Sequence, residues 1–277
     1  MVGNRYSRQT LLLELAILAC ALVFLYPLYL VVLNAFKTFP DIMSRSAHWP
    51  DAFIIDNFVR AWKATDFPKV LSNSVFVTVL SNAGIVLLSS MAAWRLARRA
   101  GKGSQLVLLL FVSSMVIPFQ SIMIPLMQIG GKLNLIGSLP GLVVLYFGLG
   151  VPFTIFLYHG FVKSIPLEIE ESAIIDGCGM QGLFWKIVFP LLKPITMTAV
   201  ILNSLWIWND FLLPVMVLHE AKMYTIPLAL YSFFAQYAKQ WDMALATLVM
   251  SMTPIIVLFL ALQRYIIRGI TAGSVKG

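Results

Sequence analysis

Long apolar runs separated by short polar segments follow one another along most of the chain. A run of about 20 apolar residues is long enough to cross the hydrocarbon of a bilayer as a helix, and a helix satisfies its own backbone hydrogen bonds there. The pattern therefore predicts an all-α polytopic membrane protein with a single transmembrane domain over residues 1–277. We place its six spans at about 11–33, 75–94, 106–129, 139–162, 195–218 and 244–264.

Helix-breaking and small residues add detail to two of these spans. Pro118 and Pro125 predict a kinked third span, since proline removes a backbone donor that neighbouring groups must then replace. Gly148, Gly150 and Pro152 predict close helix packing, or a bend beside a pathway, in the fourth span. Between the first two spans, the hydrophilic segment 34–74 predicts short helices on the outer surface.

Basic residues set the orientation of the spans. The segments that would face inward hold 12 of the 20 Lys and Arg residues, and the short outer loops hold only Lys132, Lys222 and Lys239. Because short cytoplasmic loops carry an excess of Lys and Arg, this bias places both termini and the polar loop 163–194 in the cytoplasm. Topology also accounts for the net charge of +8, so we infer no nucleic-acid partner.

The loop 163–194 is an island of charge and turn residues between the fourth and fifth spans. Ser164 as a cap and Pro166 in a first turn predict a short helix, with Gly177 and Gly179 ending it. A second helix follows from Met180. The apolar spacing of the first helix puts these side chains on one face: Leu167, Glu171, Ile174 and Ile175.

Two interpretations of this helix remain open from the pattern alone. It is either an amphipathic helix resting on the membrane surface or a docking element for a protein. Surface helices usually carry Lys and Arg on the polar face, whereas this one carries Glu168, Glu170, Glu171 and Asp176. Anionic lipid would repel those acids, which favours a protein partner.

The loop also resembles the EAA loop of ABC-importer permeases of the binding-protein-dependent (MetI-like) type. That motif is Glu-Ala-Ala, three residues, Gly, nine residues, then Ile-x-Leu-Pro, and its spacing is matched throughout. Ser172 and Phe189 depart from it, and both keep a small or apolar residue. The resemblance implies that these motif residues take part in coupling to the ATPase: Glu170, Glu171, Ser172, Ala173, Asp176, Gly177, Ile187 and Pro190.

Composition and the absence of catalytic motifs indicate a membrane protein that does not itself hydrolyse ATP or bind a metal. Hydrophobic residues make up 60% of the chain, compared with about 45–50% in soluble domains, and the mean hydropathy is +0.87. The sequence has no phosphate-binding Gly-Lys-Ser/Thr loop, no nucleophile constellation and no Cys/His metal spacing. We therefore predict no catalytic residues, no metal and no cofactor, with ATP hydrolysis left to a separate subunit.

Polar and aromatic residues gather in one segment of the fifth span. Sugars bind to aromatic faces and hydrogen-bonding groups, so this segment is a candidate pathway lining. Asp210 is also the one serious candidate for gradient coupling, although a polar residue satisfied near the outer interface explains it as well. The candidate pathway residues are Asn203, Trp206, Trp208, Asn209 and Asp210.

A second resemblance concerns substrate. The run Trp208-Asn209-Asp210-Phe211, with Pro214, is similar to a segment of carbohydrate permeases, and the ending 268–277 is similar to that of the maltose-type subunit. This implies the smaller subunit of a permease heterodimer in the bacterial inner membrane, surrounded by lipid. Its implied partners are a second permease subunit, a cytoplasmic ABC ATPase dimer, an extracytoplasmic sugar-binding protein facing loop 219–243, and a carbohydrate substrate. The sister subunit is expected to make most sugar contacts.

Three alternatives stay open at this stage. One is an ABC permease for another solute, such as glycerol phosphate or a peptide. Another is a gradient-driven carrier, which the scarcity of buried ionisable pairs disfavours. The third is a membrane scaffold or sensor without transport, which flux measurements in reconstituted vesicles would identify.

Overall fold

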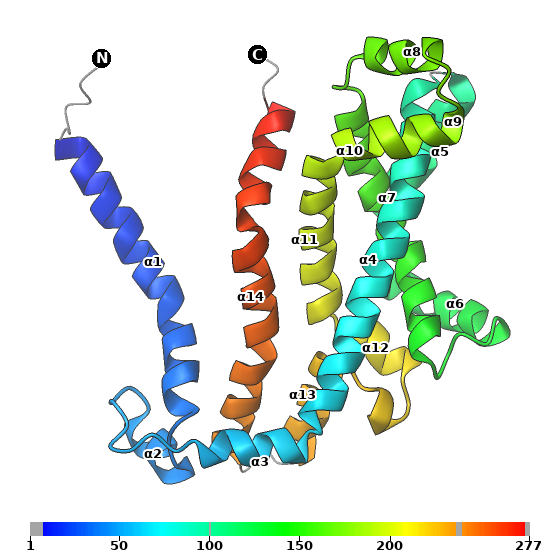
Figure 1. The fold of residues 1–277 in the computed structure, drawn as a ribbon. Helices are drawn as coiled ribbons and strands as arrows, with labels where there is room; N and C mark the ends of the chain where they lie inside the picture. The colour runs from blue at the N-terminus through cyan, green and yellow to red at the C-terminus, as the bar shows by residue number, and fades with distance from the viewer. Residues whose placement is uncertain (1–7, 100, 237–239, 275–277) are drawn as a thin grey trace. The chain divides into compact units, whose positions relative to one another are not determined.

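The computed structural model describes residues 8–99, 101–236 and 240–274, and over these residues every regular element is a helix (Figure 1). This confirms the predicted all-α fold. Four helices are long and apolar enough to cross a membrane, and two bent helix pairs bring the number to six if each pair is one span. The four long helices are α1 (Arg8–Asn34), α4 (Phe67–Arg98), α7 (Leu139–Val162) and α14 (Trp241–Ser274).

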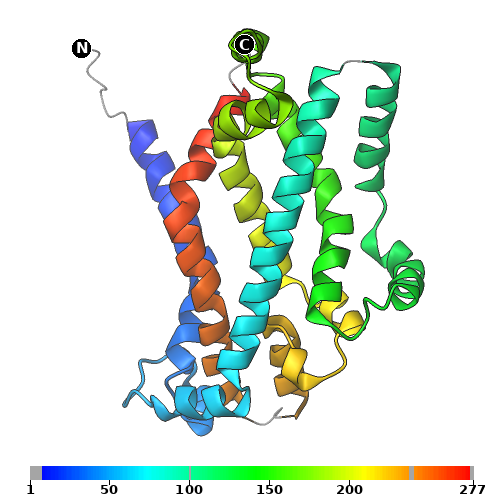
Figure 2. The ribbon, with the colours of Figure 1, turned by 45° about the vertical axis from the view of Figure 1, so that its right-hand side comes forward.

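Two pairs of successive helices are sharply bent. Helices α5 (Lys102–Ser114) and α6 (Phe119–Lys132) meet at 105°, so that α6 turns away from the direction of α5 (Figure 2). The segment Met180–Leu191 meets α11 (Lys193–Asn209) at 72°. That segment consists of α9 (Met180–Gly182), a π-helical turn (Leu183–Val188) and α10 (Phe189–Leu191).

Shorter helices complete the chain. Two of them, α2 (Phe39–Arg45) and α3 (Asp56–Ala64), are the short helices expected within 34–74. The others are α8 (Leu167–Ile175), α12 (Leu212–Val217), a 3-10 turn (Ala221–Met223) and α13 (Ile226–Gln236).

Local chemistry explains where the helices begin and stop. Helix α7 has the bounds predicted for the fourth span, because Ser138 Oγ caps it by accepting a hydrogen bond from Gly141 N–H at 3.1 Å. The bend predicted at Pro118 in the third span is present as the break between α5 and α6, since a proline disfavours helical geometry at the residue before it. Pro125 lies inside α6. The continuous helix of the fifth span stops at Asn209 rather than 218, because Asp210 adopts an extended backbone.

The chain divides into two compact units, Met1–Phe67 with Leu230–Thr253, and Pro68–Ala229 with Pro254–Gly277. In the first unit, Asn57 Nδ2 donates to the carbonyls of Ala35 at 3.0 Å and Lys37 at 2.8 Å. The Lys37 ammonium in turn donates to the carbonyls of Arg45 and Ser46. These bonds satisfy the backbone where α1 ends and the chain turns into α2.

In the second unit, α4, α7 and α11 run alongside one another (Figure 1). Glycines permit the close approach: a Cβ at Gly84 would lie 2.2 Å from the Phe147 ring, and one at Gly150 would lie 2.5 Å from Ile85. The prediction of close packing around Gly150 is thus confirmed. Polar bonds cross between the same helices, from Asn82 to Ser204, Asn203 to Thr154 and Tyr158 to Thr196.

Candidate functional site

Helix α8 lies in the loop 163–194, and its Glu170 binds to the end of α4. The Glu170 carboxylate accepts hydrogen bonds from Trp94 Nε1–H at 2.9 Å and Arg98 Nε–H at 2.8 Å, and it forms an ion pair with Arg98 Nη2 at 2.7 Å. The Arg98 guanidinium also donates to the Ile165 carbonyl at 3.0 Å. Only 5% of the Glu170 side chain is exposed, so this contact belongs to the interior of the protein.

The other side of α8 is open and mostly apolar. Ile175 is 85% exposed, Ile174 52% and Leu167 48%, and Glu171 lies exposed between them. We call this face, formed by Leu167, Glu171, Ile174 and Ile175, the coupling surface. An exposed apolar patch with acidic residues is typical of a protein-binding site rather than of a site on anionic lipid.

Gly177 ends α8 with a conformation that its motif position requires. Its φ is +81°, in the left-handed region. Gly177 N–H donates to the Ile174 carbonyl at 3.0 Å, and Cys178 N–H donates to the Ala173 carbonyl at 2.9 Å. This is a Schellman motif, which satisfies the last carbonyls of a helix and turns the chain back.

Of the remaining motif residues, two pack against the core and three are exposed. Ala173 and Ile187 pack against the core around Leu183, Phe184 and Val188. Ser172 is exposed and donates from Oγ to the Glu168 carbonyl, which explains why a serine is tolerated where the motif has alanine. Asp176 and Pro190 are also exposed.

One sequence-based detail of this loop is wrong. Ser164 does not cap α8: its Oγ donates to the Phe161 carbonyl, and α8 follows Pro166 without a side-chain cap. Sequence reasoning also missed Trp94 and Arg98 as partners of Glu170. Arg98 does stand in the basic cluster after the second span, but that signal indicates topology and not contact.

The candidate pathway residues fall into two groups. Trp206, with 41% of its surface exposed, and Asp210 line a common cavity of about 490 Å³. Asn203 is buried and donates to Thr154 at 3.1 Å, and Trp208 is buried against Val70, Ile226 and Ile255. Asn209 is exposed and donates to the Leu205 carbonyl at 2.7 Å. The structure therefore brings together two of the five.

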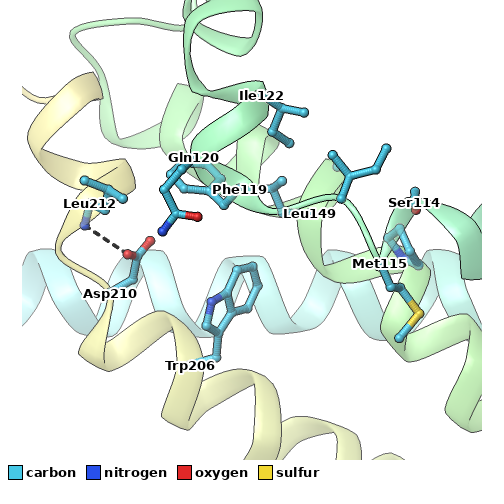
Figure 3. Close-up of a pocket in the computed structure, with 12 residues that line it drawn as sticks. Ser114, Met115, Phe119, Gln120, Ile122, Leu149, Trp206, Asp210 and Leu212 are labelled. Carbon is cyan, nitrogen blue, oxygen red and sulfur yellow. Dashed lines mark hydrogen bonds between the residues drawn. The ribbon is translucent and has the colours of Figure 1, made fainter.

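Asp210 is held in a fixed orientation at the edge of this cavity (Figure 3). One carboxylate oxygen accepts from the Tyr146 hydroxyl at 2.8 Å, and the other accepts from Leu212 N–H at 3.0 Å, which starts α12. The Trp206 ring meets the buried Tyr146 ring edge-on, with centroids 5.4 Å apart. Gln120, from α6, points toward Asp210 across the cavity (Figure 3). The sequence offered no sign of Gln120, which is one of several polar residues in this span.

Among the described residues, no three His, Cys, Asp or Glu side chains are grouped closely enough to hold a metal ion.

Comparison with known proteins identifies the family. Residues 85–272 match the family described as "Binding-protein-dependent transport system inner membrane component". The chain belongs to this family. The predicted resemblance is thus confirmed, and the chain is an inner-membrane transport component, a permease subunit and not an enzyme.

Relatives match the permease along its whole length. It is 37% identical over 268 residues to the probable starch degradation products transport permease AmyC of Thermoanaerobacterium thermosulfurigenes, covering 97% of each chain. It is 36% identical to the melibiose/raffinose/stachyose import permease MelC of Bacillus subtilis, covering 98% of each. A solved structure of a bacterial ABC transporter for the import of alginate has the same fold, with a TM-score of 0.81 at 22% identity, covering 95% of this chain and 99% of that one.

Proposed function

We propose that this chain is one membrane-spanning subunit of an ATP-driven importer for oligosaccharides or related carbohydrates. It passes substrate from an external binding protein into the cytoplasm. The carbohydrate class is supported by relatives whose names refer to starch degradation products and to melibiose, raffinose and stachyose. The observation that carries the proposal is the coupling surface, an apolar and acidic face held outward by the buried Glu170.

The coupling surface receives a cytoplasmic ATPase in this proposal. Glu171 offers a charge for a basic partner residue, while Ile174 and Ile175 offer apolar area for a cleft. Because Glu170 ties α8 to α4, movement of the ATPase pulls directly on a membrane-spanning helix. Both termini lie in the cytoplasm, and loop 219–243 meets the binding protein.

A second permease subunit completes the pathway. Helix α1 buries none of its 18-residue apolar window within its own unit. That apolar surface is available to the second subunit and to lipid.

Vesicles containing the two permease subunits and the ATPase test the coupling role. We expect Glu171→Gln to abolish the stimulation of ATP hydrolysis by substrate-loaded binding protein and to reduce uptake, with assembly unchanged. Glu168→Gln is the matched control, because it removes an equal charge one turn earlier on α8. Wild-type coupling in Glu171→Gln, or an equal loss in both variants, contradicts a specific contact at Glu171.

Orientation is tested separately with a cysteine at Ile175, the most exposed position of the coupling surface. In a background with Cys20→Ser and Cys178→Ser, Ile175→Cys is expected to react with a membrane-impermeant maleimide only in inside-out vesicles. Labelling in right-side-out vesicles places the loop outside the cell and contradicts the proposal.

The solute classes are separated by measuring uptake of five compounds: maltotriose, raffinose, a uronate trisaccharide, glycerol phosphate and a tripeptide. Uptake of the neutral sugars alone supports the proposal, and uptake of the phosphate or peptide alone favours the alternative permeases. Uptake that persists without the ATPase but collapses with an uncoupler indicates a gradient-driven carrier.

A further inference from the structure

Two helix interruptions face one cavity in the second unit. The break between α5 and α6 contributes Met115 and Ile117 to the cavity wall, and the break between α11 and α12 contributes Asp210. Irregular backbone at membrane depth occurs only where it is buried in protein or lines a cavity. In transporters, paired helix interruptions commonly mark the position where substrate is held.

The polar groups at this cavity match a carbohydrate. Trp206 presents a partly exposed ring, and Gln120 presents an exposed amide with no hydrogen-bond partner among the described residues. The Asp210 carboxylate, which accepts hydrogen bonds from Tyr146 and Leu212, also lines the cavity and presents acceptor oxygens to a sugar hydroxyl there. An aromatic face beside acceptors and an amide is a combination that sugar rings use for stacking and hydrogen bonding.

Charge narrows the substrate class further. Twelve residues line the cavity; they include one acid, Asp210, and neither Lys nor Arg. A carboxylate or phosphate on the substrate would face Asp210 without a compensating cation, and like charges at close range oppose binding. The cavity volume of about 490 Å³ lies within the roughly 300–1,000 Å³ of small-molecule sites.

We propose that this cavity is a subsite for one ring of an uncharged carbohydrate, with the ring on Trp206 and its hydroxyls on Asp210 and Gln120. The proposal rests on the proposed carbohydrate import and adds a substrate contact in this subunit. Tyr146 is a positioning residue, since its buried hydroxyl fixes the Asp210 carboxylate.

Gly148 permits a direct test by filling the cavity. It lies on α7 in the cavity wall, and an added Cβ there meets nothing within 4 Å. We expect Gly148→Leu to reduce uptake of the transported neutral sugar about tenfold or more in the reconstituted complex, with assembly and basal ATP hydrolysis retained. Gly160→Leu is the matched control, because Gly160 lies on the same helix, has equally open space and does not line the cavity.

Protection from chemical labelling gives an independent readout of binding. In the Cys20→Ser, Cys178→Ser background, Gln120→Cys reacts with a methanethiosulfonate reagent, and Gln128→Cys is the control, two turns further along α6. We expect saturating maltotriose or raffinose, whichever the wild type imports, to slow labelling of Gln120→Cys several-fold and leave Gln128→Cys unchanged. Glycerol phosphate and the uronate trisaccharide are expected to protect neither.

Each contrary outcome is distinct. Equal uptake by Gly148→Leu and Gly160→Leu, or equal labelling with and without sugar, overturns the subsite. Protection by the anionic probes overturns its restriction to uncharged sugars. Failure of Gly148→Leu alone to assemble shows that the partner subunit fills the cavity and also overturns the subsite. If the wild type imports no carbohydrate at all, the proposed function itself fails.

Discussion

Glu170 and Arg98 lie 72 residues apart in the chain and form a nearly buried ion pair, with two guanidinium nitrogens within 2.8 Å of one carboxylate oxygen. The second carboxylate oxygen accepts from Trp94 at 2.9 Å. Two adjacent glutamates of the motif therefore have opposite surroundings. Glu170 attaches α8 to its own subunit, and Glu171 remains available to a partner.

The buried ion pair predicts a stability loss that Glu171 does not share. Glu170→Gln leaves the Arg98 charge largely buried without its counter-ion, and breaking such a pair costs roughly 3–5 kcal/mol when fully buried. Because 18% of the Arg98 side chain is exposed, we expect about 2–3 kcal/mol here. Thermal unfolding of the detergent-solubilised permease measures the change, with Glu171→Gln as the control.

A double variant separates the interaction energy of the Glu170–Arg98 pair from the contributions of the two side chains taken singly. Replacing both members, as Arg98→Leu with Glu170→Leu, removes the unpaired charge, so the double variant is expected to be more stable than the sum of the single effects allows. Strictly additive losses mean that the two side chains contribute independently.

The left-handed backbone at Gly177 predicts an order among substitutions. Space is not limiting, because a Cβ at Gly177 meets nothing within 4 Å. Gly177→Val is expected to cost about 2 kcal/mol, since a branched side chain opposes this φ, and Gly177→Asn about 1 kcal/mol or less. Substrate-stimulated ATP hydrolysis should fall in the same order. Equal effects of Val and Asn exclude backbone conformation as the reason for glycine.

Close packing at Gly141 predicts that even a small added side chain lowers the stability of the protein. A Cβ there lies 1.8 Å from the Leu135 carbonyl oxygen, and a backbone atom cannot rotate away as a side chain does. We expect Gly141→Ala to cost about 3 kcal/mol, seen as a lower melting temperature. Gly160→Ala on the same helix is the control, because its surroundings are open. A melting temperature unchanged by Gly141→Ala shows that the 133–138 loop shifts freely.

In the first unit, an ion pair joins α3 to the start of α14. Arg60 contacts Asp242 at 2.7 Å and Asp56 at 3.0 Å, and only 12% of the Asp242 side chain is exposed. We expect Asp242→Asn to cost about 1 kcal/mol and to speed tryptic cleavage after Lys63 about fivefold. Asp51→Asn is the control, since its pair with Arg45 is longer and highly exposed. Unchanged cleavage in Asp242→Asn means that apolar packing alone holds this unit.

Sequence reasoning succeeded where the signal is local. Helix α7 follows from an apolar run of 24 residues with a serine cap at its start, and the turn after α8 follows from Gly177. Pro118 indicated the bend in the third span, but hydropathy could not reveal the break after Asn209 in the fifth span, because the helices on both sides of that break are mostly apolar. Nor could it tell which motif glutamate faces inward, because residues one apart differ by about 100° around a helix and the partner Arg98 is remote in sequence.

Helix α4 is long enough to contact two distant segments of the second unit, one near each of its ends. One end holds Glu170 through Arg98, and toward the other end Asn73 donates to the carbonyls of Lys222 and Tyr224. The two attachments are about 37 Å apart at about 1.5 Å per residue, and no proline interrupts the helix between them. Within the second unit, one uninterrupted helix thus joins the attachment of α8 to that of the segment 222–224, so we expect a displacement of one along the helix axis to displace the other.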